Sequence, residues 1–334
     1  MANNQKDVLV VENLTMNFKG AKRFLEKRKP DVKAVNNVSF SIREGETFGL
    51  VGESGCGKTT LGKCIVRLLK PTEGKLMYND EGEWKDLLSL KKKESFSLRK
   101  KLQIVFQDPY ASLNPQHTIL EAFDEPMRVH GIGGNKEERK KLIAEALERV
   151  NLQPEYMYRY PHEFSGGQRQ RLCVAKCLVL QPKMIICDEP VSALDVSVQA
   201  QLLNLMKKLQ SELGITYVFI AHDLSVVQYM SDRIGVMYLG NMVELADADE
   251  LYKNPLHPYT EALLSAVPVP LINAKKDRII LEGDVPSPMN PPSGCPFHPR
   301  CSKCMDICKE VKPTLRKMSD GEHHIACHLY DDKE

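Results

Sequence analysis

The sequence predicts an α/β protein with an antiparallel β part near its start, a helical insert, and a small final region rich in proline and cysteine. Three observations support this fold class. Short apolar runs alternate with amphipathic helical segments, a pattern typical of parallel sheets. Residues 8–18 and 34–43 alternate apolar with polar side chains, as half-buried strands do. After residue 254 the composition becomes dense in proline.

The individual elements follow from local patterns along the chain. ETFGLVG predicts a strand, and KTTLGKCIVRLL predicts a helix that ends before Lys70 and Pro71. KMIICDE and ITYVFIAHD are apolar runs typical of buried strands, and VSVQAQLLNLMKKLQSEL between them predicts a helix. The basic segment KGAKRFLEKRKPDVK predicts a solvated loop. We expect the proline-dense end not to continue the sheet.

These elements suggest two domains. Residues 1–254 would form the first domain, which contains the phosphate-loop-like segment GESGCGKT described below, with a helical subdomain at about 115–182, because this stretch is mainly helical in pattern. Residues 255–334 would form a separate C-terminal domain rich in proline and cysteine.

Composition limits the classes of protein that fit. The chain has 334 residues, of which 42% are hydrophobic and 27% charged, as in an ordinary globular protein. Its 46 basic and 44 acidic residues leave a net charge of +2, so no overall field favours nucleic acid. No run approaches the roughly 18 apolar residues of a membrane span, and MANNQKDVLVVENL does not resemble a signal peptide. We therefore expect a cytoplasmic protein.

Residues 52–59, GESGCGKT, match the phosphate-loop pattern G-x-x-x-x-G-K-[ST]. Glycines there let backbone N–H groups surround phosphates, and the following helix adds its dipole. Lys58 would bind the β and γ phosphates, and the Thr59 hydroxyl would bind Mg²⁺. The alternative is a glycine-rich turn before an unrelated helix. The predicted nucleotide-binding residues are Gly52, Glu53, Ser54, Gly55, Cys56, Gly57, Lys58, Thr59 and Thr60.

The phosphate loop alone does not separate kinases, GTPases and transporters, but three further segments do. EFSGGQRQR begins at residue 163, MIICDEP at 184 and SALD at 192. With these segments the chain resembles the ABC ATPases, whose signature is typically LSGGQ, with Phe164 here in place of leucine. The resemblance implies an ABC-type P-loop ATPase core. It also implies a head-to-tail dimer that holds each ATP between one phosphate loop and the other subunit's signature residues Ser165, Gly166, Gly167 and Gln168.

MIICDEP places two carboxylates at the end of an apolar strand, at the edge of the sheet where α/β proteins bind ligands. Asp188 is predicted to hold Mg²⁺, and Glu189 to polarise the water that attacks the γ-phosphate. A helix-capping carboxylate is the alternative for Glu189.

Other site residues follow from the resemblance. Gln107 is similar to the family's glutamine that touches Mg²⁺ or the water, and His222 to the histidine that contacts the γ-phosphate. Asp195 is similar to a cross-dimer contact, and Phe18, with Phe24 as the alternative, to the aromatic that stacks on adenine. One departure is Lys176, because the family commonly has arginine there.

The end of the chain indicates the branch of the family. NPLHPYT, EGDVPSPMNPPSGC and CPFHPRC resemble the ATPases of oligopeptide and dipeptide importers, a branch that also contains nickel importers. The resemblance implies a second ABC ATPase, identical or homologous, and two transmembrane permease subunits. It also implies an external peptide-binding protein, and a peripheral position on the cytoplasmic face of the cell membrane. The alternatives are a nickel or other small-solute importer, a soluble ABC ATPase of DNA repair or translation, and a redox protein in which ATP is regulatory.

Five of the ten cysteines lie in residues 295–327, a clustering that suggests a metal. Four thiolates suit either a four-iron four-sulphur (4Fe–4S) cluster or structural Zn²⁺, and one C-x₂-C pair, Cys301 and Cys304, is present. Free or disulfide-bonded thiols are the remaining alternative. The importer branch carries the 4Fe–4S cluster, so the resemblance implies four ligands: Cys295, Cys301, Cys308 and Cys327.

Overall fold

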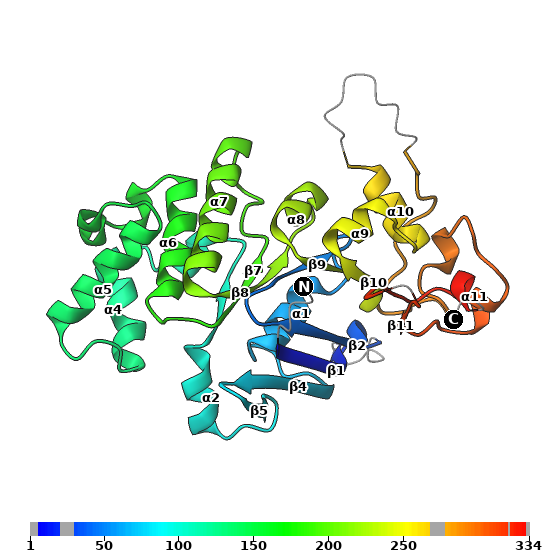
Figure 1. Cartoon of the computed structure of the whole chain (residues 1–334), viewed down its shortest axis with the longest axis horizontal. Helices are drawn as coiled ribbons and strands as arrows, with labels where there is room; N and C mark the ends of the chain where they lie inside the picture. The colour runs from blue at the N-terminus through cyan, green and yellow to red at the C-terminus, as the bar shows by residue number, and fades with distance from the viewer. Residues whose placement is uncertain (1–5, 21–29, 268–277, 320, 332–334) are drawn as a thin grey trace, which may run out of the picture. The chain divides into compact units, whose positions relative to one another are not determined.

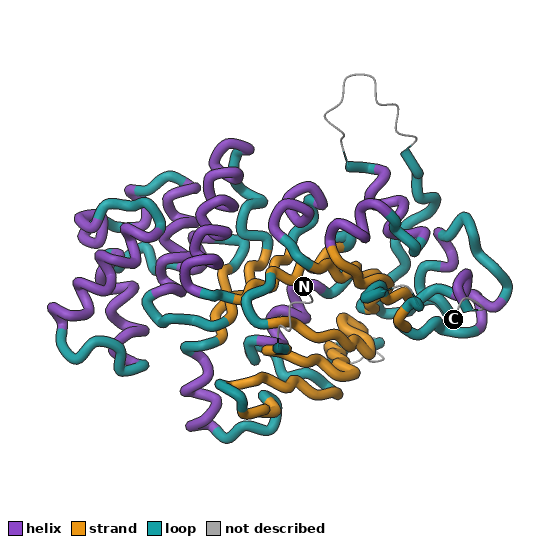
Figure 2. Tube along the Cα trace, in the orientation of Figure 1, coloured by secondary structure: helices purple, strands orange, loops and turns teal. Residues whose placement is uncertain are grey.

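The computed structural model describes residues 6–20, 30–267, 278–319 and 321–331 (Figure 1). Contacts within the chain divide it into two units, each built from segments that are distant in sequence. The first unit comprises Met1–Lys6, Arg43–Glu46 and Ser89–Ile220, and the second Asp7–Ile42, Thr47–Leu88 and Ala221–Glu334. Figure 2 shows helices and strands throughout the chain, and both units contain elements of each kind, which confirms the predicted α/β class.

The first unit contains three parallel strands: β6 (Leu102–Val105), β7 (Met184–Asp188) and β8 (Thr216–Ile220). β7 lies between the other two, because Ile186 pairs with Ile104 on one side and Val218 on the other. Every residue of β7 and β8 is buried. The apolar runs in the sequence are explained by this burial, since a parallel strand is covered on both faces.

Helices form most of the remaining first unit, and α5 packs against both α4 and α6 (Figure 1). Thr118 caps α4 in a reciprocal box, because its Oγ1 accepts the Glu121 N–H while the Glu121 carboxylate accepts the Thr118 N–H. None of the helices in the described ranges is long and apolar enough to cross a membrane. The bounds are α2 (Lys92–Arg99), α3 (Pro109–Ser112), α4 (Ile119–Val129), α5 (Lys136–Arg149), α6 (Gly166–Leu178) and α7 (Val196–Leu213), with 3₁₀ turns at Pro154–Tyr158 and Pro161–Glu163.

The second unit contains a four-stranded sheet in the order β2-β1-β4-β5. β4 is antiparallel to both β1 and β5. Along β2, the buried Val38, Phe40 and Ile42 alternate with more exposed residues, as predicted for a half-buried strand. The bounds are β1 (Asp7–Phe18), β2 (Val32–Arg43), β4 (Glu73–Asp80) and β5 (Glu83–Asp86). Much of the predicted basic loop, 21–29, lies outside the described residues.

A second group of strands in this unit leads to the phosphate loop. β3 (Thr47–Val51) is parallel to β9 (Arg233–Tyr238), which is antiparallel to β10 (Asn241–Asp247). α1 follows the loop but ends at Ile65, earlier than predicted, and Arg67 beyond it has a left-handed φ of 60°. The helices are α1 (Lys58–Ile65), α8 (Leu224–Met230), α9 (Ala248–Lys253) and α10 (Pro258–Ser265).

The expectation that the proline-dense end does not continue the sheet is wrong. β11 (Arg316–Lys317) and β12 (His324–Ile325) form an antiparallel pair, and β12 adds to β10 with Ile325 opposite Glu244. Both strands lie beyond the proline-dense stretch, where N–H groups are free to pair and the fully buried Ile325 supplies an apolar side chain. The same region contains α11 (Ile307–Glu310) and 3₁₀ turns at His298–Arg300 and His328–Tyr330.

Glu244 on β10 attaches the final segments of the chain. Its side chain is completely buried, and its carboxylate accepts the N–H groups of Leu256 and His257 at 2.7 and 3.1 Å. His323 Nε2 lies 2.7 Å from the same carboxylate. Burial lowers the pKa of His257 to about 4, so this ring is neutral at pH 7. A buried carboxylate with three partners is far less costly than an unpaired one.

Candidate nucleotide-binding site

The phosphate loop joins β3 to α1 in the second unit, as the strand–loop–helix prediction requires. Gly52, Gly55 and Gly57 have φ values of 146°, 80° and 109°, a region that other residues rarely adopt. A Cβ on Gly52 would lie 2.1 Å from the Met237 carbonyl oxygen, and one on Gly57 equally close to that of Ala34. The backbone conformation and its close packing both require glycine at these two positions.

Lys58 points back into the loop. Its side chain is buried, and Nζ donates to the carbonyl oxygens of Gly52 and Glu53 at 2.7 and 3.1 Å. The same ammonium lies 3.6 Å from Cys56 Sγ. Burial raises the pKa of the Cys56 thiol, although Lys58 acts in the opposite direction. The loop thus contains a positive charge held by its own backbone, and this charge is suited to a phosphate.

The first unit brings together two predicted residues, Gln107 and Glu189. Gln107 Nε2 donates to Glu189 Oε2 at 3.0 Å and lies 3.4 Å from Ser192 Oγ. The reason is topological: the strands that precede them, β6 and β7, are parallel neighbours with Val105 opposite Cys187. Asp188, the last residue of β7, is buried. Two carboxylates and one amide therefore lie at the carboxyl edge of this sheet.

Glu189 has a left-handed backbone with φ of 49°. A non-glycine residue in this region costs on the order of 1 kcal/mol and requires support from its surroundings. The Glu189 N–H donates to Ile220 O at 2.9 Å, and the Ser192 hydroxyl donates to Glu189 O at 3.1 Å. These bonds fix the backbone on both sides of Cα and direct the side chain toward Gln107.

The signature segment starts α6 with a capping box. Ser165 Oγ accepts the Gln168 N–H at 3.3 Å, and Gln168 Oε1 accepts the Ser165 N–H at 3.0 Å. A Cβ on Gly167 would lie 2.3 Å from Val198 Cγ1 on α7, so this position requires glycine. Phe164 is buried with its ring 5.6 Å from that of Tyr156, which shows how phenylalanine replaces leucine as a packing residue.

Asp195 caps α7. Its Oδ1 accepts the Val198 N–H at 2.9 Å and the Ser197 hydroxyl at 2.7 Å, and these bonds lower the pKa of Asp195, the hydroxyl having the larger effect. Lys176, which replaces the family's arginine, donates to Ser112 O at 2.9 Å. A single carbonyl acceptor suits a lysine, because it does not require arginine's planar fork.

Sequence reasoning missed Gln199. Its Nε2 donates to the carbonyl oxygens of Val191 and Leu194 at 3.0 and 2.9 Å, and so it fixes the SALD segment to α7. A glutamine within a helical pattern has no spacing signal that would reveal such a role.

The remaining predicted residues belong to the second unit. His222 follows β8 and is exposed, and the adjacent Asp223 caps α8 by accepting the Ser225 N–H at 2.8 Å. Phe18 is the last residue of β1 and is 38% exposed, so its ring is accessible. Thr59 and Thr60 lie in the first turn of α1. Phe24 lies outside the described residues.

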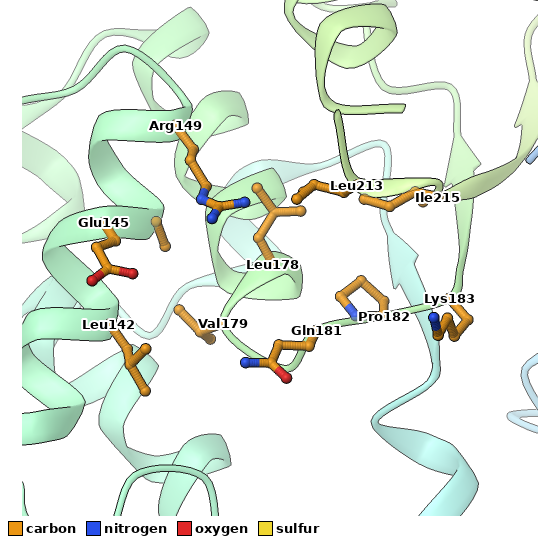
Figure 3. Close-up of a pocket in the computed structure, with 11 residues that line it drawn as sticks. Leu142, Glu145, Arg149, Leu178, Val179, Gln181, Pro182, Lys183, Leu213 and Ile215 are labelled. Atoms are coloured by element: carbon orange, nitrogen blue, oxygen red, sulfur yellow. The ribbon is translucent and has the colours of Figure 1, made fainter. Parts of the chain in front are cut away.

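A separate pocket of about 350 Å³ lies in the first unit between α5, the end of α6 and residues 181–183 (Figure 3). Arg149 and Glu145 of α5 line it beside Leu178 and Leu213. None of the predicted nucleotide residues belongs to it.

The four predicted cluster cysteines lie in one region, the structure's last segments. The pKa of Cys295 is raised to about 12 and that of Cys327 to about 11, mainly by burial, and neighbouring thiols, including Cys308 and Cys301, act in the same direction. The Cys295 N–H also donates to Cys308 O at 2.8 Å. Across the described ranges, however, no group of three or more His, Cys, Asp or Glu side chains is arranged as a metal site. The structure therefore does not support the predicted metal ligation.

A phosphate loop, a strand that ends in two carboxylates and a glycine-rich helix start define a P-loop ATPase of the cassette type. Comparison with known proteins agrees. Residues 35–192 match the ABC transporter family, and residues 243–308 match the C-terminal region of oligopeptide/dipeptide transporters. The chain belongs to the ABC transporter family and is an ABC-type ATPase.

Individual relatives match over nearly the whole chain. The Bacillus subtilis protein YkfD is 53% identical over 98% of this chain and 97% of its own length. The oligopeptide transport ATP-binding protein AppF of Bacillus subtilis is 51% identical over 98% and 99%. Among solved structures, the dimeric ATP-binding cassette MJ0796 bound to ADP and Pi is 30% identical, with a TM-score of 0.62, covering 72% of this chain and 98% of that one.

Proposed function

We propose that this chain is the ATP-hydrolysing subunit of an importer for oligopeptides or dipeptides. The observation that carries the proposal is the match of residues 243–308 to the C-terminal region of oligopeptide/dipeptide transporters. AppF, which is named for oligopeptide transport, supports it through 51% identity over nearly the full length of both chains.

In the proposed reaction, Gly52–Thr60 bind the phosphates of ATP, with Lys58 as their cation and Thr59 and Asp188 as the residues that hold Mg²⁺. Glu189 polarises the attacking water. The Glu189 carboxylate is fixed by Gln107, whose Nε2 lies 3.0 Å from Glu189 Oε2. Mg²⁺ supplies charge stabilisation when bound. His222 contacts the γ-phosphate, and Phe18 stacks on adenine. Ser165–Gln168 and Asp195 act on the nucleotide of a second, homologous or identical subunit.

The proposed partners follow from this role. Two such ATPase subunits work beneath two transmembrane permease subunits, and an external peptide-binding protein delivers the substrate. The chain is placed peripherally on the cytoplasmic face of the cell membrane, and nucleic acid is not among its partners.

The test is uptake in cells that lack this gene. We expect them to lose ATP-dependent accumulation of labelled peptides and to regain it with the wild-type gene but not with Lys58→Ala, because transport needs bound ATP. Uptake of Ni²⁺, measured in the same cells, should be unchanged. Loss of Ni²⁺ uptake with peptide uptake intact would overturn the peptide assignment in favour of a nickel importer.

We also propose that Cys295, Cys301, Cys308 and Cys327 bind a 4Fe–4S cluster, with Cys304 as a spare thiol. The donor chemistry supports this, since four thiolates are the usual ligands of such a cluster. Two of the four cysteines are also close together, because the Cys295 N–H donates to Cys308 O at 2.8 Å.

Metal analysis of protein purified without oxygen tests this prediction. We expect about four irons per chain and an absorption band at about 400 nm. Cys308→Ser should lose the iron, because one of four ligands is gone, whereas the matched variant Cys304→Ser should retain it. Stoichiometric zinc without iron would refute the cluster.

A further inference from the structure

Glu53, the second residue of the phosphate loop, is held at three points. Its N–H donates to the Tyr259 hydroxyl oxygen at 2.8 Å, and its carbonyl oxygen accepts from Lys58 Nζ at 3.1 Å. Its carboxylate makes a two-pronged pair with Arg300, with Nη1–Oε2 at 2.7 Å and Nη2–Oε1 at 3.2 Å. Two of these three contacts come from Tyr259 and Arg300, which belong to the predicted C-terminal domain that begins at residue 255.

The partners of Glu53 are themselves closely packed. Tyr259 packs edge-on against Tyr238 with ring centroids 4.7 Å apart, and Phe297 lies within 5.3 Å of both rings. All three aromatic side chains are buried almost completely. The Arg300 side chain is only 7% exposed and also lies 3.5 Å from the Tyr238 hydroxyl. The Glu53 side chain is 28% exposed, so this is a partly buried ion pair, which water and salt screen less than a pair on the open surface.

The charge of Glu53 presents a difficulty for an ATPase. ATP brings several negative charges to the loop, and an unpaired carboxylate on the same loop would repel them. Arg300 neutralises that carboxylate and holds it toward the C-terminal region of the chain. Arg300 also immediately precedes Cys301. The position of Arg300 therefore depends on the fold of residues 295–327, the cysteine-bearing region.

We propose that Arg300, supported by Tyr259, is a positioning residue for nucleotide binding: it neutralises Glu53 and couples the cysteine-bearing region to the affinity of the phosphate loop for ATP. This inference rests on the proposed binding of ATP at residues 52–60. It assigns the C-terminal region a role in binding nucleotide, in addition to whatever role it has in transport.

The test is the affinity of the full-length chain for a non-hydrolysable ATP analogue with Mg²⁺, measured by calorimetry. Arg300→Ala should weaken binding by about tenfold or more, because the carboxylate is left unpaired. The double variant R300A/E53Q should recover most of the loss, since the repelling charge is gone although the anchor is still missing. The loss in Arg300→Ala should also be larger for the ATP analogue than for ADP, which carries less charge. Lys303→Ala is the matched control, because it breaks the neighbouring 2.8 Å pair with Glu261 without touching the loop.

The outcomes separate the two proposals. If wild type fails to bind the analogue, or if Lys58→Ala binds as well as wild type, the proposed ATP site is wrong. If both behave as expected but R300A/E53Q is as weak as Arg300→Ala, Arg300 acts only as an anchor and the inference is overturned. Should Arg300→Ala fail to fold, Arg300→Lys and Tyr259→Phe serve instead. Each should weaken binding several-fold by loosening one contact, and unchanged affinity in both would also overturn the inference.

Discussion

The variant Glu189→Gln should lose steady-state ATP hydrolysis almost completely while it still binds ATP. A carboxylate that polarises water contributes on the order of 10²–10⁴ in rate, and glutamine cannot accept a proton in its place. Its similar shape preserves the hydrogen-bonding distance of 3.0 Å to Gln107. Because unhydrolysed ATP stays bound between the two subunits of the proposed dimer, the ATP-bound dimer should accumulate.

Phosphate release by the assembled transporter and nucleotide binding by fluorescence measure the two effects separately. Glu148→Gln, which changes an exposed side chain on α5, is the matched control and should hydrolyse ATP at the wild-type rate. Turnover near wild type in Glu189→Gln would exclude the assigned role, and loss of binding as well would indicate a structural defect.

The second large effect is expected for Lys58→Ala, which should bind ATP weakly. Hydrogen bonds to charged groups contribute about 1.5–3 kcal/mol each, so losing the ammonium should weaken binding about 10- to 100-fold. Titration with a fluorescent ATP analogue gives the affinity.

Two further variants make this result specific. Lys58→Met keeps much of the buried volume, so it should weaken binding equally without a large loss of stability. Lys63→Ala removes a half-buried lysine from the last turn of the same helix and should bind as wild type. Unchanged affinity in both Lys58 variants would show that this loop is not the nucleotide site.

The fold was predictable where one local signal dominates. The stretch 196–213 begins after a capping aspartate and ends before glycine, and α7 has these bounds. The strand at Met184–Asp188 was evident from its unbroken apolar run. The strands at 316–317 and 324–325 were missed, since two-residue strands have no periodicity and depend on β10 for their pairing.

The candidate site shows the same division. Glu189 and the phosphate-loop glycines lie in motifs with recognisable spacing, so the sequence indicated them, whereas Gln107 was indicated by the resemblance to the ABC ATPases. Arg300 and Glu53 are separated by 247 positions in the sequence, so only the folded structure reveals that they form an ion pair. Gln199 was missed for a related reason, because its partners are backbone carbonyls, which every residue carries.

The attachment of the chain's end through Glu244 limits how this protein can be shortened or recombined. Glu244 belongs to β10, within the predicted first domain of residues 1–254, yet its fully buried carboxylate contacts His323 near the C-terminus. A chain cut before β11 would leave a strand edge unpaired and remove one partner of a buried charge. Exchange of the C-terminal segments between such ATPases is therefore unlike exchange of independent modules, because the tail and β10 have to be transferred together.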